Sequence, residues 1–404
     1  MTGDGPRRRL HRVTVASRLF SPEVAAAAFR LRALADAFAD AGLAVDVVTT
    51  TPPGTPPGCS PPITDGTLRV HRWPALRDDN GNIRGYLHYL SYDLPLAARL
   101  VCAPRPDLYV AEPPPTTGAV VRVVAGLRRR PYLYYAADIW SEAAGSAGAP
   151  APLVALLRRL ESWAMRGATR VLAVSEEVAS RVDALGVDAA RVTVVGNGVD
   201  TDLFKPDGPS ASATEPYFVY TGTMSEWQGA EVFIEGLSAH RSRGSPGRAV
   251  FLGQGSELAA LRDCAQRLAP GAVDFLGIQP PEVAASWLRG AAAALVSIRP
   301  GLGYDFARPT KIYAATACGT PVIFAGAGAA RRLVTDDGLG WGVDHDPAAV
   351  AEAMDLALAR VAEPDTPPSP EHLVRWTTQH ASLWARANAA VAAILDTVAQ
   401  TPAR

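Results

Sequence analysis

The sequence predicts an α/β protein made of two parallel-sheet domains in tandem. Its 404 residues exceed what one hydrophobic core usually holds. Short apolar runs typical of strands alternate with helical patterns, and this alternation stops once, after Asn197, before it resumes. Strands that are separated by helices along the chain form parallel sheets buried on both faces. Each of the two alternating series therefore predicts one such sheet.

The first series begins with a β-α-β unit. Residues 13–17 (VTVAS) are expected to form a strand, residues 24–43 place Leu31, Leu34 and Phe38 near helical spacing, and residues 45–50 (VDVVTT) follow as a strand. Further strands are expected at 68–73, 107–112, 131–137, 170–175 and 192–197. We assign residues 1–197 to an N-terminal Rossmann-like domain.

The second series follows a connector. Residues 198–215 are rich in Gly, Pro, Ser and Thr and lack apolar periodicity, which is the composition of a linker. Strands are expected beyond it at 217–222, 249–255, 273–277, 293–298 and 321–326. Residues 216–370 form the predicted C-terminal Rossmann-like domain. Residues 371–404 are expected to form a C-terminal helix that packs back towards the N-terminal domain.

Composition argues against several classes of protein. Lys plus Arg number 39 against 40 Asp plus Glu, so there is no bulk electrostatic attraction for nucleic acid. The four cysteines lie far apart without metal-ligand spacing, which argues against a disulfide scaffold or a zinc module. No long apolar segment follows the basic start, and the most apolar windows fall short of the ~20 residues that cross a bilayer. We expect a cytoplasmic protein.

Two groups of basic residues leave peripheral membrane contact open. One is the N-terminal group Arg7, Arg8, Arg9 and Arg12, and the other is residues 156–166 (LLRRLESWAMR). Both suit an anionic lipid surface, and both suit solvated faces equally well.

The stretch from Arg308 to Ile323, RPTKIYAATACGTPVI, predicts an anion site. Pro309 is suited to the first position of a helix, where unpaired backbone amides attract negative charge, and Lys311 adds a full charge beside them. This geometry suits a diphosphate. An ordinary helix start with a solvated lysine explains the same residues, and the motif alone does not decide between the two. The preceding loop could contribute Arg299, Gly301, Gly303 and Arg308.

Several segments, in order between Val13 and Val343, together resemble the GT-B glycosyltransferases of family 4, within them the colanic-acid and O-antigen type. The segments are VASRLFSPEVAAAAFRLRALADAFADAGLAVDVVTT, YYAADIWSEAAGSAG, VVGNGVDTDLFKP, YTGTMSEWQGAEVFIEGL, FLGQGSELAAL and RPTKIYAATACGTPVI. The resemblance implies the GT-B fold, in which two Rossmann-like domains face a central cleft that holds the ligands.

The resemblance also implies a reaction. A retaining transferase of the hexosyl or N-acetylhexosaminyl type would move a sugar from a nucleotide diphosphate donor, UDP-linked in our expectation, held mainly by the C-terminal domain. The acceptor on the N-terminal domain would be a lipid-linked saccharide or a small molecule, in the biosynthesis of surface polysaccharide or a glycosylated natural product. Neither a metal nor a cofactor is implied, and the enzyme would work in the cytoplasm, at the inner face of the membrane if the acceptor is lipid-linked.

Site residues follow from the same resemblance. Lys311, Arg299 and the Thr310 amide would carry the charge of the leaving group. Asp138 would orient the transferred sugar or the acceptor, although it also suits the N-cap of a segment that begins at Ile139. The turn after the first strand of the C-terminal domain would approach the phosphates, or would simply be a tight turn, through Gly222, Thr223, Gln228 and Gly229.

The chain departs from the family pattern in two respects. The basic pair that other members carry in the turn after the first strand of the C-terminal domain is Thr223 and Gln228 here, although the polysaccharide subgroup also tends to lack this pair. Many members carry a glutamate at each of the positions that are Phe306 and Ala314 here, and the second of these grips the ribose hydroxyls. Neither residue accepts such hydrogen bonds. Two alternatives therefore stay open: a non-catalytic relative that serves as a binding or activating partner, and a nucleotide-sugar epimerase on the same fold.

Overall fold

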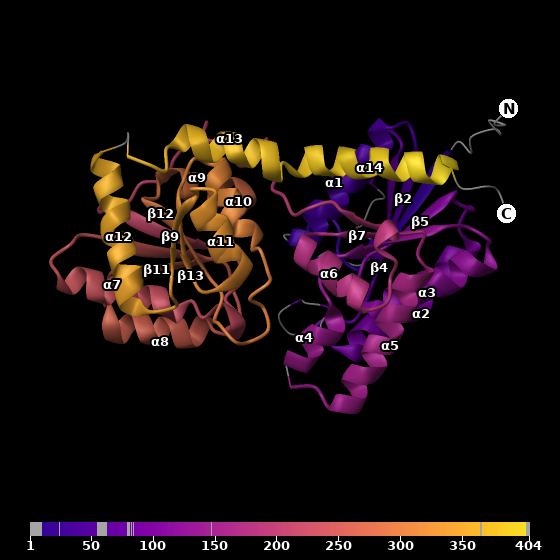
Figure 1. Ribbon diagram of the computed structural model, residues 1–404, viewed down its shortest axis with the longest axis horizontal. Helices are drawn as coiled ribbons and strands as arrows, with labels where there is room; N and C mark the ends of the chain where they lie inside the picture. The colour runs from indigo at the N-terminus through magenta and orange to yellow at the C-terminus, as the bar shows by residue number, and fades with distance from the viewer. Residues whose placement is uncertain are drawn as a thin grey trace. The chain divides into compact units, whose positions relative to one another are not determined.

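The computed structural model describes residues 10–23, 25–54, 63–78, 81, 83, 85–146, 148–363 and 366–400. The chain divides into two compact units, Met1–Asn197 with Leu383–Arg404, and Gly198–Ser382 (Figure 1). Each unit is built around its own sheet, in which parallel pairing predominates. The predicted fold class, two Rossmann-like sheets in tandem, is confirmed. Each unit is described below by itself.

The first unit contains an eight-stranded sheet in the order β3-β4-β2-β1-β5-β6-β7-β8. Only the pairing of β3 with β4 is antiparallel. Residues in β1 and β5 such as Val13, Val15 and Val110 are completely buried, as expected where helices cover both faces of a sheet. Its strands are β1 (Arg12–Ala16), β2 (Ala44–Thr50), β3 (Ile63–Asp65), β4 (Leu68–Trp73), β5 (Leu108–Ala111), β6 (Tyr132–Ala136), β7 (Arg170–Ala173) and β8 (Val192–Val194).

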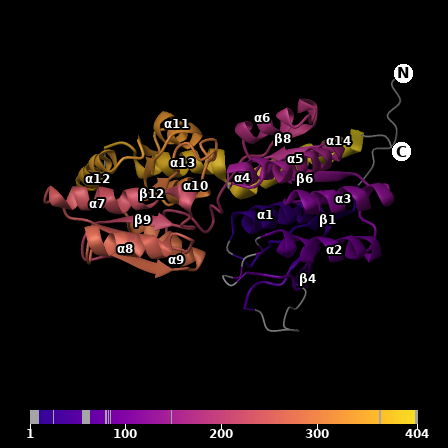
Figure 2. The same cartoon turned by 90° about the horizontal axis from the view of Figure 1, so that it is seen from below.

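Helices cover both faces of this sheet. Helix α1 (Ala26–Asp40) packs against α14 (Leu383–Gln400), while α2 (Tyr86–Cys102), α3 (Pro115–Leu127) and α5 (Ala151–Gly167) pack side by side in that order (Figure 2). The chain crosses from β1 to β2 in one direction and from β5 to β7 in the other. Right-handed crossovers therefore place α1 and α3 on opposite faces. The shorter helices are α4 (Trp140–Ser146) and α6 (Glu176–Ala184).

The second unit contains a parallel six-stranded sheet in the order β11-β10-β9-β12-β13-β14. Helices α7 (Glu231–Ser242) and α12 (Pro347–Ala362) pack together, and α10 (Thr310–Ala317) packs against α9 (Pro281–Gly290) and α13 (Pro370–Ala381). Helices α8 (Leu258–Leu268) and α11 (Gly328–Asp336) complete the unit. Its strands are β9 (Tyr217–Thr221), β10 (Arg248–Leu252), β11 (Val273–Gly277), β12 (Ala293–Ser297), β13 (Val322–Ala325) and β14 (Gly340–Val343).

The structure differs from the predicted elements in three places. Strands β3 and β14 were not predicted, and the glycine-rich sequence of β14, GWGV, gives little strand signal. Helix α10 begins at Thr310, so that Pro309 precedes the helix instead of opening it. The C-terminal helical segment is broken at Ser382, whose backbone is extended and forms a parallel bridge with Val199. Helix α13 therefore belongs to the second unit and α14 to the first.

Within the part of the chain that the structure describes, no helix is both long enough and apolar enough to cross a bilayer.

In each sheet the parallel strands end at one common edge. Loops at the carboxyl edge of such a sheet are where ligands bind in open α/β folds. The side chains at these two edges are therefore the candidate ligand-binding groups.

Candidate active site

Lys311 lies in the first turn of α10, at the carboxyl edge of the second unit's sheet. Its Nζ atom is buried, and no hydrogen-bond partner for it exists among the described residues. Loss of hydration on burial lowers the pKa of the Lys311 ammonium from its ordinary value to about 7. This is not the solvated lysine of an ordinary helix start. The ammonium group can therefore pair with an anionic ligand, because no described residue supplies a hydrogen-bond partner for it.

The turn after β9 lies directly beneath this lysine. Nζ of Lys311 is 3.9 Å from the centre of the Tyr220 ring, and a Cβ atom on Gly222 would lie 3.8 Å from Nζ. The Tyr220 hydroxyl donates to the Thr223 carbonyl at 2.7 Å, which holds the turn against the strand. Gly253 passes so close that a Cβ atom there would be 2.0 Å from the Gly222 carbonyl oxygen. Backbone groups of this turn thus reach the same place as the lysine.

Arg299, directly after β12 and Ile298, is engaged within the unit. Its side chain forms an ion pair with Glu231, in the first turn of α7, and its backbone N–H donates to the Trp227 carbonyl at 2.9 Å. The Trp227 ring in turn stacks on Tyr304 with centroids 4.7 Å apart. Arg299 therefore brings a charge to this edge that Glu231 already neutralises in part, whereas Nζ of Lys311 has no hydrogen-bond partner among the described residues.

Gly229 and Gln228 shape the turn before α7. Gly229 has a left-handed backbone with a φ of 59°, and a Cβ atom on it would be 2.6 Å from Nε2 of His345. That nitrogen also lies 2.9 Å from the Gly229 carbonyl oxygen. The Gln228 side chain is buried, and its Oε1 accepts from the Ser225 N–H at 3.0 Å. Gln228 and Gly229 thus maintain the turn, and His345 is a neighbour that the sequence did not reveal.

The loop that leads into α10 is held by Asp305. Its Oδ2 accepts from the Gly301 N–H at 3.3 Å, and its carbonyl accepts from the Ala329 N–H at 2.9 Å. Gly301 and Gly303 both have φ near 80°, so the loop needs left-handed backbone there. Arg308 and Thr310 are half-buried at the loop end, and Phe306 and Ala314 leave their positions without a carboxylate. Asp305 is the acidic residue of this loop.

Asp138 lies in the first unit, two residues after β6, and is exposed. The protein around its carboxyl removes part of its hydration and raises its pKa, and the Arg30 guanidinium opposes this rise. The alternative role of Asp138 as a helix cap is not seen, because Glu161 accepts from the Trp140 and Ser141 N–H groups at 2.8 and 3.0 Å. Asp138 thus lies at the carboxyl edge of this sheet, and its side chain does not cap the helix that follows.

A buried carboxylate, Glu112, accompanies Asp138. It directly follows β5, accepts from the Ser17 hydroxyl at 3.2 Å, and lies 3.8 Å from the Arg30 guanidinium. Burial raises the pKa of Glu112, Arg30 opposes the rise, and the charge of Asp138 adds to it. The ends of β1, β5 and β6 thus place a hydroxyl and two carboxylates near one arginine.

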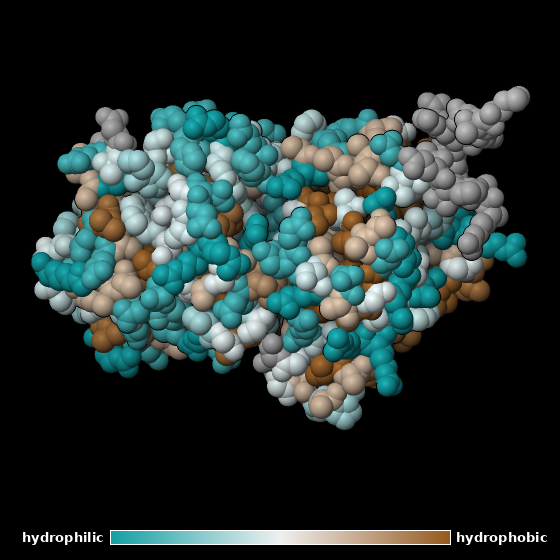
Figure 3. Space-filling model, in the orientation of Figure 1, coloured by the Kyte–Doolittle hydropathy of each residue, from teal (hydrophilic) through white to brown (hydrophobic). Residues whose placement is uncertain are grey.

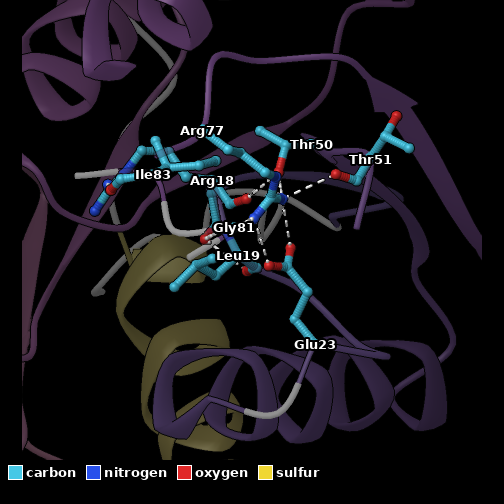
Figure 4. Close-up of polar contacts among 9 residues, drawn as sticks. Arg18, Leu19, Glu23, Thr50, Thr51, Arg77, Gly81 and Ile83 are labelled. Atoms are coloured by element: carbon cyan, nitrogen blue, oxygen red, sulfur yellow. Dashed lines mark hydrogen bonds and ion pairs between the residues drawn. The ribbon is translucent and has the colours of Figure 1, made fainter. Parts of the chain in front are cut away.

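Figure 4 shows a second polar cluster at this edge, centred on Arg77. The guanidinium is 3.1 and 3.2 Å from the two Glu23 oxygens and donates to Thr50 Oγ1 at 2.9 Å and to the Gly81 carbonyl at 2.8 Å. Burial raises the pKa of Glu23, and Arg77 opposes that rise. The cluster ties together the loops that follow β1, β2 and β4.

Arg18 completes the first unit's edge. It is 6% exposed, and its Nη1 donates to the Ile83 carbonyl at 3.0 Å. Its guanidinium lies 4.5 Å from the centre of the Tyr89 ring and 5.4 Å from that of Trp140. The cation is therefore held by carbonyls and aromatic faces.

Sequence comparisons identify the family of the chain. Residues 25–198 match the family model described as "Glycosyl transferase 4-like domain", and residues 215–360 match "Glycosyl transferases group 1". The two matches together span most of the chain, and the first ends at the boundary between the two units while the second begins at residue 215. The chain belongs to the group 1 glycosyltransferases. The edges described above are therefore the candidate active-site surfaces of a group 1 glycosyltransferase.

The curated relatives of this group 1 glycosyltransferase are similar over part of their length. One from Xylanimonas cellulosilytica, named D-inositol 3-phosphate glycosyltransferase, is 32% identical over 215 residues, 47% of this chain and 48% of that protein. The chain thus matches about half the length of that curated relative. These names support the glycosyltransferase family and leave the colanic-acid and O-antigen subtype unconfirmed.

Solved structures agree on the fold. The Anabaena protein Alr3699/HepE, solved with UDP and glucose, has a TM-score of 0.68 at 19% identity, covering 96% of this chain and all of that one. A protein from Listeria monocytogenes described as a putative UDP-N-acetylglucosamine 2-epimerase has a TM-score of 0.65 at 13% identity, covering 98% of each chain. At such identities the likeness extends to the fold alone, which both types of enzyme share.

Proposed function

We propose that this group 1 glycosyltransferase moves a sugar, with retention of configuration, from a UDP-linked donor to an acceptor hydroxyl. The donor diphosphate would sit against Lys311 and the amides at the start of α10. The acceptor would be a lipid-linked saccharide or a small molecule, in the biosynthesis of surface polysaccharide or a glycosylated natural product. The relatives' name makes D-inositol 3-phosphate one small molecule to include in a test.

One observation carries this proposal: Nζ of Lys311 is buried at the carboxyl edge of a parallel sheet and has no hydrogen-bond partner among the residues that the structure describes. Leaving a cation buried without a partner is costly, so such a group marks a site completed by a ligand. A diphosphate supplies two negative groups, one for the lysine and one for the amides of a helix N-terminus. That a neighbour of the same fold was solved with UDP supports this choice of ligand.

The proposed chemistry uses positioning and electrostatics. The bond from the anomeric carbon to the diphosphate breaks while the acceptor oxygen bonds to the same face of that carbon. The acceptor proton passes to the departing phosphate oxygen, so no enzymic nucleophile is required. Lys311 stabilises the charge that develops on the leaving group, and Asp138 orients the sugar or the acceptor. In this proposal a lysine and helix amides do the work of a metal ion, and no cofactor takes part.

Mass spectrometry of reaction mixtures tests the proposal. The full chain would be incubated with UDP-, GDP- and dTDP-sugars, each with D-inositol 3-phosphate, short lipid-linked saccharides, or no acceptor. With a UDP-sugar we expect a product that is the acceptor enlarged by one sugar residue. A chelator should not change the amount of this product. Abolition by the chelator would contradict the metal-free mechanism.

The same mixtures, together with donor-binding calorimetry, separate the alternatives. Conversion of one UDP-sugar into its epimer without an acceptor would assign the chain to the epimerases. Tight association with another protein, with no donor bound in calorimetry, would identify a non-catalytic partner. Either result would overturn the transferase proposal.

A further inference from the structure

The outer face of α2 carries an uncovered apolar stripe. Leu87, Leu90, Leu94 and Val101 are spaced by three, four and seven residues, so their side chains follow one side of the helix. All four are exposed, with Leu87 at 74% and Leu94 at 69%. An apolar stripe that runs the length of a helix is ordinarily buried against another element. No described part of the chain covers this one.

The stripe continues onto the helices beside it. Helix α3 packs against both α2 and α5, so that the three form one layer. Leu127 on α3 is 73% exposed and Leu156 on α5 is 63% exposed. Figure 3 shows hydrophobic residues gathered over the part of this unit where Figure 1 draws these helices. The α2–α3–α5 face, meaning the solvent-exposed side of these three helices, thus carries exposed apolar side chains on each of them.

All the exposed charges that these three helices carry have one sign. Asp93 and Glu161 are the two acidic residues within α2, α3 and α5, and they are 1% and 0% exposed. Both carboxylates form hydrogen bonds within the unit: Asp93 accepts from the Thr117 hydroxyl at 2.6 Å, and Glu161 accepts from the Ser141 hydroxyl. The exposed charges are instead Arg158, Arg159 and Arg166 on α5, while the half-buried Arg99 and Arg122 lie over the rings of Trp73 and Trp163. Because the whole chain is nearly neutral, this positive face is a local feature.

The arginines of α5 also line a depression. Its volume is about 330 Å³, and Arg158, Arg159 and Arg166 surround it together with Ser162 and Leu185. No carboxylate lines it. Three guanidinium groups and a hydroxyl form a donor set that suits phosphate oxygens.

We propose that the α2–α3–α5 face docks on a bilayer that contains anionic phospholipid. The exposed leucines would enter the boundary between headgroups and acyl chains, and the arginines would contact lipid phosphates, with one headgroup in the α5 depression. A second copy of the chain fits less well, because a two-fold contact would bring the same arginines together. This inference goes beyond the proposed function and does not depend on the transfer reaction.

Vesicle co-sedimentation of the full chain tests the docking. The vesicles would be phosphatidylcholine alone, or phosphatidylcholine with phosphatidylglycerol. We expect binding to the anionic vesicles only, weakened by added salt. R158Q with R159Q should weaken it about thirtyfold, because each basic residue near an anionic surface contributes about a factor of five. L87Q with L94Q should also weaken it at least tenfold, through loss of apolar insertion.

Matched controls lie on the second unit. Leu356 is 54% exposed on α12, and Arg332 is exposed on α11, so L356Q and R332Q alter the same residue types elsewhere. Both should bind like the wild type, and circular dichroism would verify that all variants are folded. Equal binding to both vesicle types, no binding, or undiminished binding by the α2 and α5 variants would overturn the proposal. So would self-association that L87Q with L94Q abolishes, which would assign the face to a second copy.

Discussion

The carboxyl edges of the two sheets differ in how their buried cations are satisfied. In the first unit Arg77 is paired with Glu23, Arg30 lies beside Glu112, and Arg18 donates to carbonyl groups. In the second unit the buried Nζ of Lys311 lies over the face of Tyr220 and has no hydrogen-bond partner in the described part of the chain. A compensated cation stabilises the fold, whereas an uncompensated one reduces stability until an anion arrives. The contrast separates structural charges from a ligand-binding charge, and it can be tested on both sides.

The largest effect is expected at the compensated edge. Arg77→Met would leave Glu23 buried without its partner, and removing one member of a buried pair costs about 3–5 kcal/mol. The side chains of Arg77 and Glu23 are 12% and 10% exposed, so water replaces little of the loss. Chemical denaturation should show this decrease in the free energy of unfolding. The exposed Arg332, changed in R332M, should alter it by less than about 0.5 kcal/mol. Equal stability of the two variants would refute the structural role of the Arg77 cluster.

Lys311→Met should have the opposite signature. UDP-glucose affinity should fall by about 1.5–3 kcal/mol, the contribution of a charge-assisted contact. The thermal midpoint should rise, because an apolar group replaces a buried cation that has no partner. Calorimetry and thermal unfolding measure the two effects.

Lysine occurs at only two positions, 205 and 311, and Lys205 is exposed. Lys205→Met is therefore the matched control, and it should change neither quantity. An Lys311→Met variant that binds UDP-glucose like the wild type would remove Lys311 from the donor site.

Asp138→Asn should have a smaller and more selective effect. The substitution keeps the shape of the side chain and removes the charge that we assign to orienting the sugar or acceptor. Turnover should fall about tenfold or more, with donor affinity within about twofold of the wild type. Steady-state kinetics with donor-binding calorimetry separates the two. An equal loss of turnover and donor affinity would show that Asp138 contributes to donor binding and not specifically to turnover.

The smallest expected effect is a change of protonation on donor binding. With a pKa lowered to about 7, Nζ of Lys311 is largely neutral at pH 8.5 in the free protein, whereas the bound diphosphate favours the charged form. Binding of UDP-glucose should therefore take up close to one proton at pH 8.5 and less as the pH falls below 7, and affinity should decrease as the pH rises above 7. Calorimetry in buffers of different ionisation enthalpy counts these protons. Proton uptake unchanged in Lys311→Met would assign it to another group.

The predicted architecture was correct because the hydrophobic alternation that produced it is local. Strands such as β5 and β13 are continuous apolar runs that lie between helices, so a short window suffices to find them. Strand β14 escaped because its glycines leave little apolar signal, and the break at Ser382 escaped because no proline or glycine marks it. That break is stabilised by contact with Val199, far away in the sequence.

The site was harder to predict because its geometry depends on distant pairs. Lys311 was found from a local motif, but its burial over the Tyr220 ring of β9 joins positions that are far apart in the sequence. Glu231 neutralises Arg299 across 68 positions, and His345 reaches Gly229 across 116. Glu112 was visible only as the last residue of a predicted strand. Neighbours of this kind can be identified only when the order and register of the strands are known.

The position of Lys311 over the Tyr220 ring has a kinetic consequence. A lysine held in a salt bridge must give up its carboxylate before it can meet a ligand, whereas one resting on an aromatic face gives up only a weak attraction of about 0.5–2 kcal/mol. The site is in this sense preorganised, because the ring holds the side chain in position without competing for its charge. Donor capture should therefore lack a slow rearrangement step, and its observed rate should grow in proportion to donor concentration.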